Sequence, residues 1–360
     1  MPARPAAVQA AAGLSCKSQI KELEEEMMNK TIREIVDKAL GGGEIGAAEL
    51  RALFAVDYLS EESYLIQYAS RKMSDGACKG KAEVHAQVGL NSGSCPRDCQ
   101  FCSFAAMNKI FTSSKVRPLE EIIESCLNFE AGGANAIYLM ATATYKFADF
   151  LKVGREVKQA LKTAVPLIAN VGDFDEDEAR ALKKSGFDGI YHAVRLGEGV
   201  ITKIDPRKRL QTIDLAAKAG LKVGTCLEPV GPEHTLEELV EKTLITRDMK
   251  PAYSGAGRRV NIPGSPLAAH GSLSYAQMAP ILAAVRLAVG YDVVGNCTHE
   301  PNKIGAMAGA SLLWAEVGSN PRDTSESTVR GWTVKNTQEV LTEAGWEVLE
   351  GPSVMFGASA

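Results

Sequence analysis

The sequence has 360 residues, with 40 Lys or Arg and 44 Asp or Glu, which gives a formal net charge of −4. Hydrophobic residues make up 45% and charged residues 23%, the composition of a globular chain that is long enough to bury a large core. The mild acidity predicts neither nucleic acid nor membrane as a partner, and no apolar run approaches the roughly 20 residues of a membrane span.

Two features of the chain point to a reducing compartment. Residues 1–16 are rich in Ala and Pro but lack a secretory signal pattern, so we expect a flexible N-terminus and a cytoplasmic protein. The sequence contains eight cysteines, and three of them fall within eight residues. Clustered cysteines in a large chain without an export signal indicate metal ligation rather than disulfides.

The remaining chain divides into three predicted parts. Apolar residues at helical spacing predict a helical extension over residues 17–80. From residue 81 to 325, short apolar segments alternate with amphipathic helices, and residues 326–360 are expected to hold one more helix and a tail. The expected strands are Val84–Leu90, Asn135–Met140, Val165–Val171, Gly189–Val194, Leu221–Leu227, Arg259–Ile262, Asp292–Gly295 and Ser311–Trp314.

The alternation predicts an α/β fold. Gly186, Gly220 and Gly290 each end a predicted helix just before a strand, the helix C-cap signal of repeated βα units. Eight such units in roughly 250 residues match a (β/α)8 barrel of the TIM type, in which active sites form at the C-terminal ends of the strands. A doubly wound open sheet is the alternative.

Directly after the first predicted strand stands a C-x3-C-x2-C motif formed by Cys95, Cys99 and Cys102. Three thiolates on one compact loop can converge on three irons of a [4Fe–4S] cluster and leave the fourth iron open for a small molecule. The alternative, a structural zinc site, needs four closed ligands, and no second cysteine pair follows at suitable spacing.

The segment Ser92-Gly93-Ser94-Cys95-Pro96-Arg97-Asp98-Cys99-Gln100-Phe101-Cys102 resembles the radical S-adenosylmethionine (SAM) enzymes, in particular the biotin synthase branch. The resemblance extends from about Lys38 to the end of the barrel. It includes Asn261–Leu267, placed on strand six, and Met307–Ala310 before strand eight.

The resemblance implies a cofactor and a mechanism. The three cysteines of the motif would hold the [4Fe–4S] cluster, and SAM would chelate its open iron. One electron, from a flavodoxin or ferredoxin, would cleave SAM to methionine and a 5′-deoxyadenosyl radical. That radical would abstract hydrogen from an unactivated C–H bond, while the barrel positions the cofactor and excludes water.

The resemblance also assigns SAM contacts. Phe101 would lie beside the adenine, Glu198 would accept from the ribose hydroxyls, and Arg209 would pair with the SAM carboxylate. A surface charge is the alternative for Glu198 and Arg209. Where the family carries a Gly-rich turn after strand two, this chain has Met140-Ala141-Thr142. The full set of expected cofactor contacts is Phe101, Met140, Thr142, Asn170, Glu198, Arg209 and Ile262.

Biotin synthases draw sulfur from an auxiliary cluster deep in the barrel. The positions that match its ligands here are Leu139, Ile168, Gly224 and about Gly295, which cannot ligate iron. The resemblance therefore favours the two-component lipoyl synthases: a sulfurtransferase (EC 2.8.1 type) with a differently held auxiliary iron–sulfur cluster, acting on an octanoyl chain of a carrier protein.

Two further cysteines lie at predicted strand exits, Cys226 and Cys297. Soft thiolates at the top of the barrel predict auxiliary-cluster ligands, with Cys16, Cys78 or His299 as additional ligands. Ordinary buried thiols are the alternative, and Cys126, at helical spacing from apolar residues, is expected in the core.

The sequence also allows two other interpretations of the function. Polar residues at strand ends could bind a small amino-acid-like substrate for rearrangement or C–C cleavage, as in methylornithine synthase or hydrogenase maturation; His192 and His299 would then be orienting groups or structural histidines. These residues are Asn170, Asp173, His192, Arg258, Arg259 and Glu300. The non-enzyme alternative is an iron–sulfur electron carrier, against which three ligands rather than four argue.

Overall fold

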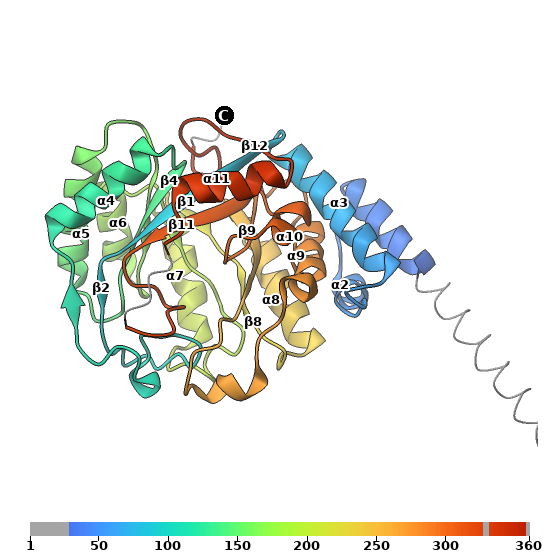
Figure 1. The fold of residues 1–360 in the computed structure, drawn as a ribbon, viewed down its shortest axis with the longest axis horizontal. Helices are drawn as coiled ribbons and strands as arrows, with labels where there is room; N and C mark the ends of the chain where they lie inside the picture. The colour runs from blue at the N-terminus through green and yellow to red at the C-terminus, as the bar shows by residue number, and fades with distance from the viewer. Residues whose placement is uncertain (1–28, 327–330, 358–360) are drawn as a thin grey trace, which may run out of the picture.

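The computed structural model describes residues 29–326 and 331–357, and within them the chain forms a closed barrel of eight parallel strands surrounded by helices (Figure 1). The ring runs β1-β4-β5-β6-β7-β9-β10-β11 and closes because β11 pairs with β1, in a register that sets His85 opposite Trp314. The predicted (β/α)8 fold is confirmed, and the open sheet is excluded by this closure.

The ring strands lie close to the predicted segments, except that the predicted strand Asp292–Gly295 shares only Gly295 with the observed one and that the sixth strand lies elsewhere. The segment Arg259–Ile262 is not a strand; the sixth strand is β9, which ends at Arg258, so Asn261–Leu267 follows it in a loop and a short 3-10 turn. The strands are β1 (Lys81–Gly89), β4 (Ala136–Met140), β5 (Leu167–Asn170), β6 (Gly189–Tyr191), β7 (Lys222–Gly224), β9 (Tyr253–Arg258), β10 (Gly295–Cys297) and β11 (Leu312–Val317).

Amphipathic patterns in the sequence predict helices at Leu119–Ala131, Ala148–Leu161, Asp175–Ser185, Arg207–Ala219, Leu236–Met249, Tyr275–Ala288, Lys303–Gly309 and Lys335–Ala344. The helices of the structure match these segments to within a few residues. Their ends follow local chemistry: Asp175 and Glu178 form a capping box at the start of α6, and Thr235 and Glu238 do so at α8. These helices are α4 (Leu119–Ala131), α5 (Phe147–Ala160), α6 (Glu176–Lys184), α7 (Pro206–Lys218), α8 (Leu236–Asp248), α9 (Tyr275–Val289), α10 (Lys303–Met307) and α11 (Val334–Glu343).

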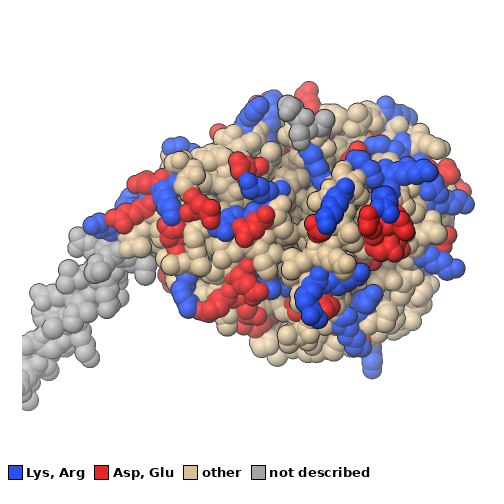
Figure 2. Space-filling view, turned by 180° about the vertical axis from the view of Figure 1, so that it is seen from behind, with Lys and Arg blue, Asp and Glu red and all other residues tan. Residues whose placement is uncertain are grey.

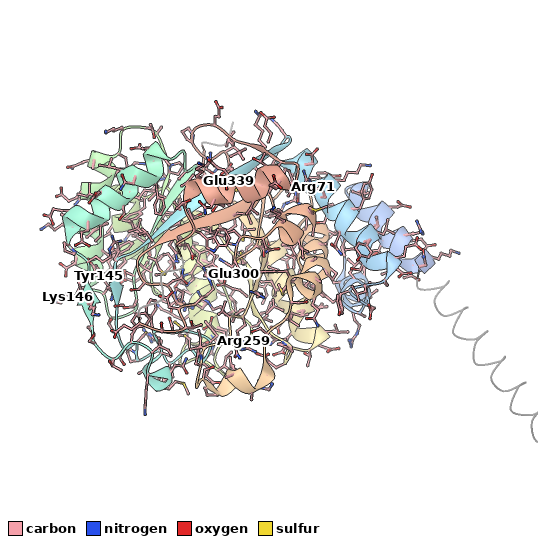
Figure 3. All side chains as sticks on the ribbon, in the orientation of Figure 1. Arg71, Tyr145, Lys146, Arg259, Glu300 and Glu339 are labelled. Atoms are coloured by element: carbon pink, nitrogen blue, oxygen red, sulfur yellow. The ribbon has the colours of Figure 1, made fainter. Side chains whose placement is uncertain are left out.

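The N-terminal extension packs on the side of the barrel. Residues 29–40 are helical, and α2 (Ala47–Phe54) and α3 (Glu61–Ala77) bury an apolar face against α8 and α9 (Figure 1). Arg71 of α3 stacks over Trp346 with its guanidinium carbon 3.7 Å from the ring centre, which ties the extension to the segment after α11 (Figure 3). The expected flexible N-terminus, the first part of the extension and Cys16 lie outside the described residues.

The C-terminal segment closes the opposite end of the barrel from the site. Strand β12 (Glu347–Val348) pairs with β1, and the Val354 N–H donates to Glu83 Oε1 at 3.0 Å. Phe356 is buried against His85 and Tyr138 inside the ring. On the face in Figure 2, positive and negative side chains are interspersed, and no described helix is long and apolar enough to cross a membrane.

Candidate active site

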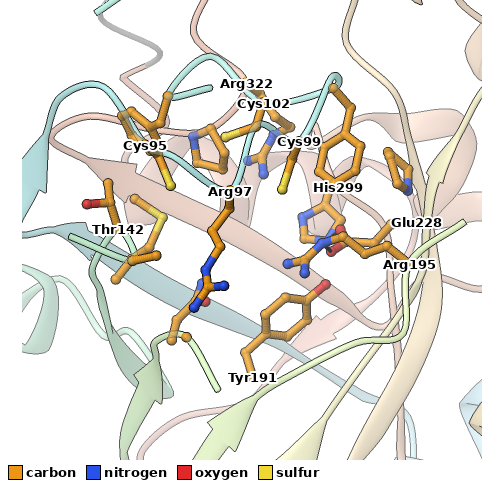
Figure 4. Close-up of a pocket in the computed structure, with 18 of the residues that line it drawn as sticks. Cys95, Arg97, Cys99, Cys102, Thr142, Tyr191, Arg195, Glu228, His299 and Arg322 are labelled. Atoms are coloured by element: carbon orange, nitrogen blue, oxygen red, sulfur yellow. Dashed lines mark ion pairs between the residues drawn. The ribbon is translucent and has the colours of Figure 1, made fainter. Parts of the chain in front are cut away.

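A pocket opens at the C-terminal ends of the strands, where the fold class predicts it. Its wall combines the cysteine loop with side chains from β4, β5, β6, β9 and β11 and from the loops after them. In Figure 4, Cys95, Cys99 and Cys102 lie on the loop above the pocket, and Tyr191, Arg195, Glu228 and His299 lie across from them. The strand ends thus bring widely separated residues to one cavity.

The loop is folded back on itself by its own backbone. The Cys95 N–H donates to the Phe104 carbonyl at 2.6 Å, and the Cys102 N–H donates to the Cys99 carbonyl at 2.8 Å. Asn108 Nδ2 donates to the Cys102 carbonyl at 2.9 Å. Asp98 adopts a positive φ of 48°. These bonds fix the backbone so that all three cysteines face one pocket.

The three cysteines fit an iron–sulfur cluster better than a single ion. Zinc–sulfur bonds of about 2.3 Å bring tetrahedral ligands to within roughly 3.8 Å of one another. The three loop sulfurs are not among the ligand groups of the described chain that converge within 4.8 Å. Burial raises the pKa of the Cys99 thiol to about 11, and burial raises that of Cys102 above its ordinary value. Ligation therefore has to displace protons.

Several expected SAM contacts line this pocket. Thr142 is held by Asn91, whose Oδ1 accepts from the Thr142 N–H at 2.9 Å and whose Nδ2 donates to Thr142 Oγ1 at 2.8 Å. Asn170 Nδ2 donates to Gln87 Oε1 at 3.0 Å. Phe101 lies 5.9 Å from the Arg195 guanidinium carbon. The pocket is lined by Phe101, Met140, Thr142, Asn170 and Arg209 from the expected set.

Glu198 and Arg209 are buried, which excludes the surface-charge alternative. Arg209 lines the pocket but is already held: its Nε lies 3.6 Å from Glu198, and its Nη1 lies 3.4 Å from Asp173 and 3.2 Å from His192 Nε2. Glu198 accepts from the Arg195 N–H and from a threonine hydroxyl and does not line the pocket. The pair is thus part of a buried network.

His192 belongs to the same network. Its Nε2 lies 3.0 Å from Asp173 Oδ1, and burial lowers the pKa of His192 to about 4. Burial disfavours charge on Asp173 too, but the bond to His192 and the charge of Arg209 bring its pKa to about 2. His192 is accordingly a neutral, hydrogen-bonded histidine at the pocket wall.

Three of the sequence-based expectations need correction or confirmation. Ile262 is buried but does not line the pocket, because the segment that contains it lies beyond strand β9. Cys78 ends α3 in the core between the barrel and α9 and does not join Cys226 and Cys297, so it is not an additional ligand. Cys126 is buried among apolar residues, as expected.

Cys226, Cys297 and His299, which the sequence suggests as auxiliary-cluster ligands, lie close together in the structure. Each offers a donor atom within 4.8 Å of the other two, and all three side chains are buried. His299 lines the pocket, whereas the two cysteines lie behind the pocket wall. Cys226 falls in the gap between β7 and β8 (Leu227–Val230), both of which pair with β9.

Four charged residues of the pocket, Arg195, Glu228, Glu316 and Arg322, were not predicted from the sequence. Arg195 pairs with Glu228 at 3.3 Å, and Arg322 pairs with Glu300 at 2.9 Å and with Glu316. Burial opposes the charge on Arg195, yet Glu228 and Glu198 hold its pKa above the ordinary value. No motif marks these residues; the only signal was their position shortly after predicted strands.

The family comparison agrees with the motif. The sequence model of the radical SAM superfamily matches residues 92–243. Curated relatives include the biotin synthase of Citrifermentans bemidjiense, 25% identical over 233 residues (62% of this chain, 69% of that protein). The biotin synthase of Desulforudis audaxviator is 30% identical over 218 residues (58% of this chain, 65% of that protein).

Solved structures support the fold. Methylornithine synthase superimposes with a TM-score of 0.75 at 17% identity, over 88% of this chain and 97% of that one. The hydrogenase maturase HydG from Carboxydothermus hydrogenoformans gives 0.73 at 18% identity, over 94% and 82%. The cysteine motif and the superfamily match over residues 92–243 identify a radical SAM domain in this chain, and the curated relatives place its similarity in the biotin synthase-like branch.

Proposed function

We propose that this radical SAM enzyme inserts sulfur at an unactivated C–H bond, with an auxiliary iron–sulfur centre as the sulfur source. The observation that carries the proposal is the convergence of the Cys226 and Cys297 thiols behind the pocket wall. A sulfur-inserting enzyme needs soft ligands close to the site where the substrate radical forms. The curated relatives named biotin synthase add support.

In this proposal, different residues of the chain bind the cluster, contact SAM and exclude water. Cys95, Cys99 and Cys102 hold the [4Fe–4S] cluster, which together with SAM supplies a 5′-deoxyadenosyl radical when bound. Thr142, held by Asn91, offers a polar contact to SAM at the end of β4. The buried aromatic and apolar side chains of the wall exclude water from the reacting carbon.

A second candidate, rearrangement or C–C cleavage of an amino-acid-like substrate, is favoured by the charges that line the pocket. Arg195, Arg209, Arg259 and Arg322 each pair with an acidic side chain. Within the described residues, Arg97 and Arg258 form no ion pair, and Arg258 stacks instead on Tyr275 at 4.0 Å. Two guanidinium groups without acidic partners suit a substrate carboxylate.

The proposal includes two partners. A flavodoxin or ferredoxin donates the electron, and the substrate of the sulfur insertion is an octanoyl chain on a carrier protein. Under the second candidate, the substrate is a free amino-acid-like molecule that the pocket encloses.

The deciding experiment measures how much iron and sulfide each chain binds. The wild-type chain and a Cys95→Ala/Cys99→Ala/Cys102→Ala variant are reconstituted anaerobically, and iron and sulfide are quantified. Sulfur insertion predicts iron beyond the ~4 per chain of one cubane in the wild type and residual iron in the variant. It also predicts a sulfur-containing product when the octanoylated carrier is incubated with SAM and dithionite.

The opposite outcome favours the second candidate. About four irons in the wild type and none in the variant, together with deoxyadenosine formation stimulated only by amino acids, would refute sulfur insertion and leave the radical chemistry intact. Absence of 5′-deoxyadenosine with an intact cluster would instead leave the electron-carrier alternative.

A further inference from the structure

Cys226, Cys297 and His299 have a geometry that identifies the kind of centre they can hold. Their donor atoms lie within 4.8 Å of one another, and no other trio of Cys, His, Asp or Glu in the described chain does so. The position is set by the backbone: an added Cβ on Gly255 of β9 would lie 1.9 Å from the Cys297 carbonyl oxygen, so β9 and β10 approach closely at this point. The thiol of Cys297 is thereby fixed on the barrel wall.

This spacing matches one metal ion. Tetrahedral zinc binds sulfur at about 2.3 Å and imidazole nitrogen at about 2.0–2.1 Å, which separates neighbouring ligand atoms by roughly 3.5–3.8 Å. A cubane instead distributes its protein ligands over different irons. Two thiols and one imidazole gathered within 4.8 Å therefore require only a small contraction to surround a single ion.

His299 provides an independent observation. Its side chain is 9% exposed, yet Nδ1 has no hydrogen-bond partner within the described residues. Nε2 lies 3.1 Å from Glu228 Oε2, and Arg195 holds that carboxylate from the other side at 3.3 Å. Metal-bound histidines commonly direct their second nitrogen at such a carboxylate, which orients the ring and leaves the other nitrogen for the ion.

Further polar atoms around the trio also have no hydrogen-bond partner in the described chain. They are the hydroxyls of Tyr191 and Tyr253 and the indole nitrogen of Trp314, all buried. The Trp314 ring stacks on the His299 ring with centres 5.8 Å apart. The Tyr191 ring packs edge-on against the His299 ring with centres 6.3 Å apart. Buried donors without acceptors are costly, and thiolate or sulfide ligands would satisfy them.

We propose that Cys226, Cys297 and His299 ligate a single iron ion, with a fourth position left for a sulfur ligand. His299 and Tyr191 line the pocket (Figure 4), so the ion lies just behind the wall at which the substrate binds. This site would serve the sulfur insertion proposed above, but metal binding does not depend on that activity, so the two can fail separately.

The test uses Co²⁺ as a spectroscopic probe on the full chain with Cys95, Cys99 and Cys102 changed to Ala, so that the cluster loop cannot bind it. We expect one Co²⁺ per chain, thiolate-to-cobalt charge-transfer absorption and tetrahedral ligand-field bands. Cys226→Ser/Cys297→Ser on this background should abolish these bands, and His299→Ala should shift and weaken them. Cys126→Ser, which removes a buried thiol elsewhere, is the matched control and should change nothing.

Glu228→Gln tests the orienting role separately. It leaves all three ligands in place and should weaken Co²⁺ binding by about 10-fold or more. Bound metal should also raise the unfolding midpoint of the background protein, which reports binding even where a cysteine variant folds poorly.

Several results would overturn the proposal. These are a folded background protein without stoichiometric Co²⁺, cobalt in octahedral oxygen coordination, or charge-transfer bands that survive the loss of both thiols. If Co²⁺ binds as expected but the reconstituted enzyme transfers no sulfur, the metal site stands and the proposed sulfur insertion fails.

Discussion

Glu228 is the residue whose replacement tests the electrostatic design of the pocket most directly. Its carboxylate lies 3.3 Å from Arg195 and 3.1 Å from His299, and the side chains of Arg195 and Glu228 are 20% and 14% exposed. Burial alone would raise the pKa of Glu228, but His299 and Arg195 hold it below its ordinary value. The carboxylate is therefore charged at neutral pH, and Glu228→Gln leaves Arg195 without its nearest anion.

The loss of stability that Glu228→Gln causes can be estimated from this geometry. Two unit charges 3.3 Å apart at an effective dielectric constant of about 20 attract by roughly 5 kcal/mol, and breaking a fully buried pair usually costs about 3–5 kcal/mol. Both side chains are partly exposed, so solvent screens part of this attraction. We therefore expect Glu228→Gln to lower the free energy of unfolding by about 2–3 kcal/mol. The double variant Arg195→Met/Glu228→Gln also removes the unpaired positive charge of Arg195. It should therefore recover about half of the lost free energy of unfolding.

Urea unfolding of the four proteins of this double-mutant cycle, prepared without metal and followed by tryptophan fluorescence, measures the coupling free energy. A coupling of about 2 kcal/mol is expected. If each single change costs less than about 0.5 kcal/mol and the two effects add, the pair is only a solvated contact and the reasoning is refuted.

Three other predictions concern the cluster, the buried histidine and the barrel wall. Cys99→Ala should abolish SAM cleavage to 5′-deoxyadenosine and the cluster absorption, whereas Cys126→Ala should preserve both; cleavage by the Cys99 variant would contradict the ligand assignment. Because burial lowers the pKa of His192 from 6.5 to about 4, folding keeps it neutral, so up to about 3 kcal/mol of stability present above pH 6.5 should be lost as the pH falls towards 4. Urea midpoints measured from pH 7.5 to 4.5 should show this slope, and an equal slope in His192→Gln would disprove it. Gly255→Ala, with φ at 145° and its new Cβ 1.9 Å from the Cys297 carbonyl oxygen, should yield little folded protein, and a normal unfolding transition would count against the close strand approach.

Sequence patterns predicted the helices and strands well where apolar residues recur at a regular helical or strand spacing. Amphipathic helices such as α4 and α5 were found nearly to the residue, because the apolar stripe of each helix is a local signal. Strand β9 was missed: Tyr253–Arg258 contains two glycines and a serine, so its sequence lacks an apolar alternation. Its burial comes from the neighbouring strands β8 and β10, and no local pattern reports that contact.

The residues of the pocket also differ in whether a local sequence signal marks them. Cys95, Cys99 and Cys102 could be found from spacing alone, because their chemistry is confined to one loop. Arg195 and Glu228 could not, because their importance comes from a contact between residues that follow two neighbouring strands and lie far apart in the sequence.

By itself, the sequence determined the repeated βα pattern, the cysteine motif and the family, since each depends on residues close together in the chain. Tertiary structure alone decided which distant side chains meet. The pairing of β9 with both β7 and β10 brings Cys226 next to Cys297 and His299, and Arg209 of one unit is buried against Asp173 of the preceding unit. The physical reason is that parallel strands joined by helices carry sequence-distant residues to one end of the barrel, where strand register and burial, rather than spacing in the chain, determine contact.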